Sequence, residues 1–104
     1  MKEKYIIVKV RFKDKNKANV IFNTLLNRML VAGGTISKVI SKYYEKGRVL
    51  MHEDYELNLE TKSVNFEKIC RIIENTYGDE NYKAFAIDIE KINSNFSRYI
   101  DIVR

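Results

Sequence analysis

The spacing of apolar residues along the chain constrains the fold more than any other feature of the sequence. Residues 4–12 alternate between apolar and other side chains, which indicates a strand with one buried face. The alternation is clearest in residues 48–60 and returns in residues 82–90. Residues 35–44 complete a hairpin with residues 48–60, and Gly47 supplies the positive φ that a tight turn needs.

Other segments carry apolar side chains at three- and four-residue intervals, the spacing of one helix face. The first runs over residues 18–29, and the glycine pair 33–34 is expected to end it. The second begins near Ser63 and ends at Gly78. Residues 93–103 predict a short helix after the last strand.

The resulting order is strand, helix, strand, strand, helix, strand, then a terminal helix. This order predicts an α+β, ferredoxin-like β-α-β-β-α-β fold, with an antiparallel sheet and two helices on one face. No linker or repeat divides the chain, so we expect residues 1–104 to form a single domain.

The second face of such a sheet has no helix to cover it. Strand alternation predicts that small and charged side chains lie there: Ile7, Lys9, Arg11, Asp54, Glu56, Asn58, Glu60, Ala84, Ala86 and Asp88, with Ser37 and Ser41 as additions from the hairpin. Phe85, Ile87 and Ile89 are expected to point the other way, toward the helices. Small residues permit close approach of another surface, and tyrosines are enriched at interfaces. The face is predicted to be an interface between copies of the chain; a solvated face is the alternative.

Composition narrows the possible classes of protein. The chain is 45% hydrophobic and 32% charged, as in ordinary globular domains. It has no signal-peptide pattern and no apolar run of roughly 20 residues, the length that spans a bilayer. Its one cysteine cannot form an internal disulfide, so a cytoplasmic location is expected. The net charge of +5 favours anionic partners, although AT-rich codon usage would also enrich lysine.

No enzyme motif is recognisable. The chain has neither a P-loop nor a G-x-G-x-x-G sequence, and Cys70 lies on an apolar helix stripe as a small core residue. We therefore expect no catalytic residues, no enzyme and no cofactor. His52, with Glu53 and Asp54, could hold a divalent ion weakly at the base of the hairpin; a solvated polar turn is the alternative.

Basic and tyrosine side chains gather on the predicted strands and hairpin. Guanidinium and ammonium groups bind phosphate, and tyrosine rings stack on bases. Each lysine could instead be an edge charge that discourages sheet aggregation, and Arg11 could pair with Glu56 or Glu60 across the sheet. The predicted binding set is Lys9, Arg11, Lys38, Lys42, Tyr43, Tyr44, Arg48, Lys62, Tyr82 and Lys83.

Three segments resemble the CutA divalent-cation-tolerance family: RMLVA at 28–32, SKYYEKGRV at 41–49, and the acidic run into a strand at 53–61. Element order agrees over about residues 4–90. The resemblance implies a homotrimer of ferredoxin-like subunits, with sheet edges joined around a three-fold axis and clefts between subunits. The PII signalling proteins look similar in architecture and bind nucleotides in such clefts.

The chain also departs from that family. Glu45 stands where the family has Trp, Glu60 where it has Lys, and residues 77–80 keep only the glutamate of an H-P-Y-E segment. These differences disfavour a metal function.

The sequence therefore predicts a non-enzymatic CutA/PII-like homotrimer that binds a small anionic, nucleotide-type ligand between subunits. It would sense the ligand or sequester it, as a viral sponge for nucleotide immune signals would; neither a membrane nor a nucleic acid partner is expected. One alternative is a divergent CutA copper-tolerance protein that uses His52. A purely structural or partner-binding trimer is another.

Overall fold

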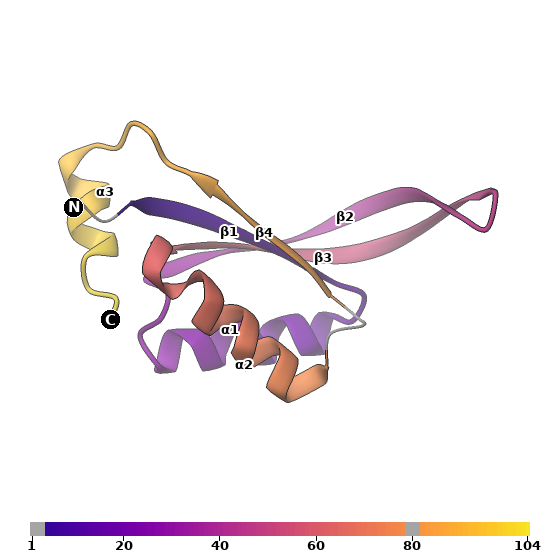
Figure 1. Cartoon of the computed structure of the whole chain (residues 1–104), viewed down its shortest axis with the longest axis horizontal. Helices are drawn as coiled ribbons and strands as arrows, with labels where there is room; N and C mark the ends of the chain where they lie inside the picture. Colours follow the sequence, from indigo (N-terminus) through magenta and orange to yellow (C-terminus); the bar gives the residue numbers. More distant parts are fainter. Residues whose placement is uncertain (1–3, 79–81) are drawn as a thin grey trace.

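The structure, a computed structural model, describes residues 4–78 and 82–104. Within them lies one four-stranded antiparallel sheet in the order β2-β3-β1-β4 (Figure 1). Its strands are β1 (Tyr5–Phe12), β2 (Gly33–Glu45), β3 (Arg48–Lys62) and β4 (Tyr82–Asp88). The helices are α1 (Lys15–Asn27), η1 (Ser63–Asn65, a 3-10 turn), α2 (Phe66–Tyr77) and α3 (Ser94–Ile100). The predicted ferredoxin-like α+β fold is confirmed.

The core lies between the sheet and the pair α1 and α2, which cover one of its faces (Figure 1). Every second residue of β1, from Ile6 to Phe12, is buried there, as the alternation predicted. Leu57 and Leu59 of β3 join them. The helices contribute Ala18, Ile21, Leu25, Ile69 and Ile73. Burying one such large aliphatic side chain stabilises a fold by about 1.5–3 kcal/mol.

Helix α1 begins at Lys15, before the predicted apolar stripe of residues 18–29, and ends well before the glycine pair. The Asp14 carboxylate accepts a hydrogen bond of 2.8 Å from the backbone N–H of Asn16 and so caps the helix. The helix stops at Asn27, and Met29 takes a positive φ of 57°. The prediction that the 33–34 glycine pair ends this helix is therefore wrong. A Cβ on Gly34 would collide with the backbone oxygen of Asn58, so this glycine serves close strand approach.

The alternation was assigned to the wrong faces in β4. Ala84 and Ala86 pair with Val10 and Val8 of β1 and so share the helix-covered face. Phe85 pairs with Lys9 on the opposite face, and 48% of its surface is exposed. Ile87 pairs with Ile7 on that face, whereas Asp88 pairs with Ile6 and lies with the alanines. The prediction failed because it assumed that the larger apolar residues of a strand face its own helices. Here the small residues do.

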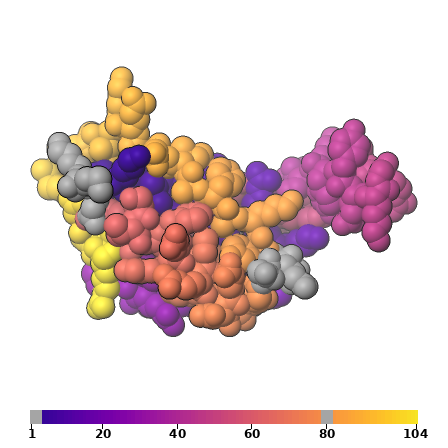
Figure 2. Space-filling model, in the orientation of Figure 1, coloured from indigo at the N-terminus to yellow at the C-terminus, as the bar shows by residue number. Residues whose placement is uncertain are grey.

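The β2–β3 hairpin extends beyond the helices as a two-stranded arm (Figure 1), and it protrudes from the body in the space-filling view (Figure 2). Lys46 and Gly47 turn the arm with positive φ values of 51° and 78°, the conformation of a tight hairpin turn. By register, Ser37 and Ser41 lie opposite Glu56 and His52 on the uncovered face, as expected. The other face of the arm exposes large apolar side chains: Ile40, Tyr44, Val49 and Met51.

Part of the segment compared with the H-P-Y-E motif, residues 79 and 80, lies outside the described residues. Among the helices that the structure does describe, none is long and apolar enough to cross a membrane.

Candidate ligand-binding site

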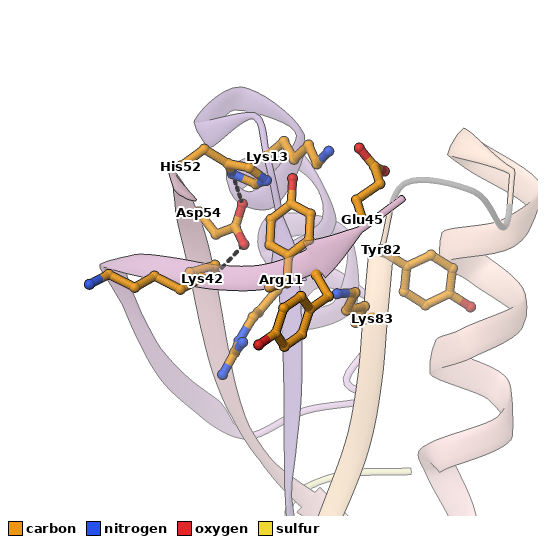
Figure 3. Close-up of a pocket in the computed structure, with 11 residues that line it drawn as sticks. Arg11, Lys13, Lys42, Glu45, His52, Asp54, Tyr82 and Lys83 are labelled. Carbon is orange, nitrogen blue, oxygen red and sulfur yellow. Dashed lines mark hydrogen bonds and ion pairs between the residues drawn. The ribbon is translucent and has the colours of Figure 1, made fainter. Parts of the chain in front are cut away.

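A pocket of about 370 Å³ lies on the uncovered face, where the hairpin arm leaves the sheet (Figure 3). Its lining comes from the end of β1, from β2 and β3 of the arm, and from β4. The fold brings to it several residues of the predicted binding set: Arg11, Lys42, Tyr43, Tyr44, Tyr82 and Lys83. His52, predicted as the alternative metal ligand, lines it as well.

Arg11 is tied to an acidic partner within the sheet. Its Nε donates a hydrogen bond of 2.9 Å to Oε2 of Glu56, one of the two pairings anticipated from the sequence. Lys9 Nζ lies 3.4 Å from the other Glu56 oxygen and does not line the pocket. Burial alone would raise the pKa of Glu56, but the hydrogen bond from Arg11 and the charge of Lys9 together hold it below its usual value. Glu56 thus holds Arg11 in place at the pocket wall.

Aromatic and cationic side chains stack across the pocket from β4 to β3. The ammonium of Lys83 lies 5.5 Å from the centre of the Tyr43 ring, within cation–π range. The Tyr43 ring in turn meets the His52 ring edge to face, with centres 5.2 Å apart. The side chain of Lys42 takes no part in these contacts and points away from Lys83 (Figure 3). Three strands therefore meet through the side chains of Lys83, Tyr43 and His52.

Behind His52 lies a short polar chain. Its Nδ1 is 2.9 Å from Oδ1 of Asp54, which is buried. The other Asp54 oxygen accepts a 2.6 Å hydrogen bond from the Ser41 hydroxyl. Both contacts are drawn as dashed lines in Figure 3. The imidazole is held from one side by groups on β2 and β3.

Tyr82 lines the pocket on the β4 side and also contacts residues outside the pocket. Its ring stacks on Phe12 with centres 6.4 Å apart, and its hydroxyl donates a 2.8 Å hydrogen bond to Glu74. Burial and this bond raise the pKa of Tyr82 far above its usual value, so the phenol stays protonated.

The remaining residues of the predicted set lie elsewhere. Lys38 pairs with Glu53 at 2.7 Å in an exposed position, and that hydrogen bond raises the pKa of Lys38. Arg48 lies at the tip of the arm, outside the pocket lining. Lys62 is 3.3 Å from Asp101, beside α3 at the far end of the sheet.

Sequence reasoning missed some of the lining: Lys13, Ser41, Glu45 and Asp54 were not in the predicted binding set. Strand alternation had already placed Ser41 and Asp54 on the same face as Arg11, and that signal could have found them. Lys13 directly follows the first strand and carried no periodic signal of its own.

The donor set of the described chain is poor in metal ligands. Within residues 4–78 and 82–104, no three His, Cys, Asp or Glu side chains cluster where they could hold a metal ion. Cys70 is half-buried on α2, and burial raises the pKa of its thiol.

The described residues define a ferredoxin-like α+β protein with a long hairpin arm and a mixed-charge pocket at its base. The family model of the CutA1 divalent ion tolerance protein matches residues 6–102. The chain therefore belongs to the CutA1 divalent ion tolerance protein family.

Solved CutA1 structures share the fold. CutA1 from Oryza sativa superposes with a TM-score of 0.88 at 16% identity, covering 97% of this chain and 94% of that one. CutA1 from Pyrococcus horikoshii gives 0.85 at 19% identity, covering 95% and 98%. The divalent cation tolerance protein of Thermus thermophilus gives 0.81 at 21% identity, covering 96% and 95%. No match was found among curated protein sequences.

Proposed function

We propose that this chain acts in the cytoplasm as a non-enzymatic homotrimer that binds a small anionic, nucleotide-type ligand in the pocket at the base of the arm. The observation that carries the proposal is the gathering of Arg11, Lys83 and Tyr43 from three different strands around one cavity. These three residues lie far apart in the sequence, and the cluster that they form lies outside the core.

The chemistry of the lining suits a nucleotide. Its volume of about 370 Å³ falls in the range typical of small-molecule sites. Lys83, Lys13 and the guanidinium of Arg11 supply positive charge for phosphate. The Tyr43 ring, which lines the pocket on the same face of the arm as His52, offers an aromatic surface on which a base can stack.

A trimer would cover surfaces that a single chain leaves open. Phe85 and Ile87 are each about half-exposed on the sheet face without helices. The arm adds exposed apolar side chains of its own, such as Val49 and Met51. Groups of exposed apolar side chains such as these support an interface on each of the two faces. In such a trimer the pocket, at the arm's base, would lie close to a neighbouring subunit, and the bound ligand would be sensed or sequestered there.

The test is calorimetry of the purified protein with AMP and with ATP. Arg11→Ala and Lys83→Ala should each weaken binding by roughly tenfold to a hundredfold, because hydrogen bonds to charged groups contribute about 1.5–3 kcal/mol. Lys68→Ala, on the exposed side of α2, is the matched lysine control and should bind as the wild type does. Equal affinity in all variants would contradict the proposed site.

A divalent-cation function is the alternative, favoured by the family's name and by the contact of His52 with Asp54. A carboxylate behind a histidine is a common arrangement at metal sites. The described residues fit such a site poorly, since they place one imidazole there without two further ligands. We expect only weak copper or zinc binding in calorimetry. Stoichiometric submicromolar binding that His52→Ala abolishes would instead establish the metal function.

A further inference from the structure

His52 carries a polar atom that the fold leaves unused. Its Nε2 is buried and has no hydrogen-bond partner among the described residues, although the residue lines the pocket. Buried nitrogens of this kind are nearly always paired in proteins, because an unpaired one loses its hydrogen bond to water without replacement. An exception next to a cavity is therefore informative.

The surroundings of the ring determine what Nε2 can do. Nδ1 forms a hydrogen bond of 3.4 Å with the backbone oxygen of Glu53. It also lies 2.9 Å from Oδ1 of Asp54, without hydrogen-bond geometry, so Oδ1 has no hydrogen-bond partner among the described residues. Both neighbours are acceptors, so the neutral ring keeps its hydrogen on Nδ1. Ser41 holds the carboxylate from its other side through a 2.6 Å hydrogen bond. In this neutral tautomer Nε2 carries the lone pair and can accept a hydrogen bond.

Tyr43 packs against the His52 ring and also lines the pocket. The two rings meet edge to face, and the Tyr43 ring is otherwise contacted by the ammonium of Lys83. An anion that binds Lys83 would draw this ammonium away from the ring. A rotation of the Tyr43 side chain alone would then expose His52 to the pocket.

We propose that His52 determines ligand specificity: its Nε2 accepts a hydrogen bond from an amino or hydroxyl group of the anionic ligand once Tyr43 turns aside. The inference rests on the proposed function and narrows the ligand to anions that also carry a hydrogen-bond donor, as nucleotides do. Simple anions would use only the cationic residues of the pocket.

The experiment compares AMP with sulfate, an anion that carries no hydrogen-bond donor at neutral pH, as probes of the full chain and of His52→Phe. The phenyl ring keeps the packing against Tyr43 and removes both nitrogens. AMP affinity should fall roughly twofold to tenfold, the loss of one neutral hydrogen bond, while sulfate affinity stays the same. Lys83→Ala should weaken the binding of both probes.

Nitrogen-15 NMR gives a second readout, because His52 is the only histidine in the chain. The free protein should show the Nδ1–H tautomer, and AMP, but not sulfate, should shift the Nε2 resonance. In Asp54→Asn, the side-chain amide can donate to Nδ1 while its oxygen accepts from Ser41. The ring hydrogen should then move to Nε2, and the selectivity for AMP should be lost.

These measurements distinguish a wrong role for His52 from a wrong proposed function. If AMP binds wild type and His52→Phe equally and leaves Nε2 unshifted, the role of His52 is wrong and the pocket stands. If neither probe binds the wild type, the proposed function falls, and the role of His52 falls with it.

Discussion

Glu56 shows how one buried carboxylate organises the uncovered face. It accepts contacts from Arg11 at 2.9 Å and Lys9 at 3.4 Å, and only 9% of its side chain is exposed. Sequence reasoning identified Arg11 correctly as a strand-borne cation that could pair across the sheet. It could not tell which of the basic residues already have acidic partners, because that depends on strand register and side-chain reach. Lys38, paired with Glu53, and Lys62, beside Asp101, are two such cases.

The stability of the protein should depend on Glu56 in acid. Its pKa is lower in the folded chain than the ordinary value of 4.5, so the folded form holds the proton less tightly than the unfolded form. The stabilisation is therefore complete above about pH 4.5 and is lost as the pH falls through the folded-state pKa. Urea denaturation of the wild type between pH 7 and pH 3 should show this loss.

Glu56→Gln is the control for that measurement. The amide cannot titrate, so the variant should be less stable than wild type near neutrality and should lose less stability in acid. An acid dependence identical to that of the wild type would assign the effect to other carboxylates.

At the scale of elements, the alternation in β4 predicted that a strand exists but not which of its faces the helices cover. Period-two spacing gave the strand and its limits to within a few residues, but the choice of face depended on an assumption about where apolar residues go. In β4 the large apolar residues Phe85 and Ile87 share a face with Lys83, so the type of side chain did not reveal which face the helices cover. The end of helix α1 was mispredicted for a related reason. The chain turns after Asn27 with a positive φ at Met29, and methionine gives no sequence signal for that conformation.

The orientation of β4 predicts opposite effects for two neighbouring substitutions. Phe85→Asp, on the uncovered face, should leave the subunit fold intact and dissociate the proposed trimer. Ala84→Asp should destabilise the fold by roughly 2 kcal/mol or more, because Ala84 packs against the core and a charge there loses its hydration. Light scattering and thermal denaturation of both variants check the pair. Loss of folding in Phe85→Asp with a normal Ala84→Asp would mean that the faces are reversed.

At the scale of the whole molecule, the order of strand and helix patterns along the chain was enough to predict the fold. The sheet order β2-β3-β1-β4 follows from two crossovers around a hairpin, and right-handed crossovers leave few other arrangements. The pocket could be predicted only in part. Arg11 and Lys83 lie far apart in the sequence and come together because β1 and β4 are neighbours, with these two residues directly opposite each other. Lys13 and Glu45 line the same cavity through loop and arm geometry that spacing does not encode.

Native mass spectrometry of the protein purified from expressing cells tests the central claim most directly, because one spectrum reports both assembly and retained ligand. We expect a species of about three times the 12.3 kDa chain mass. It should carry small anionic adducts that AMP or ATP can displace, and these adducts should be lost in Lys83→Ala. A monomer at micromolar concentration, or a trimer that takes up no nucleotide when one is added, would contradict the account.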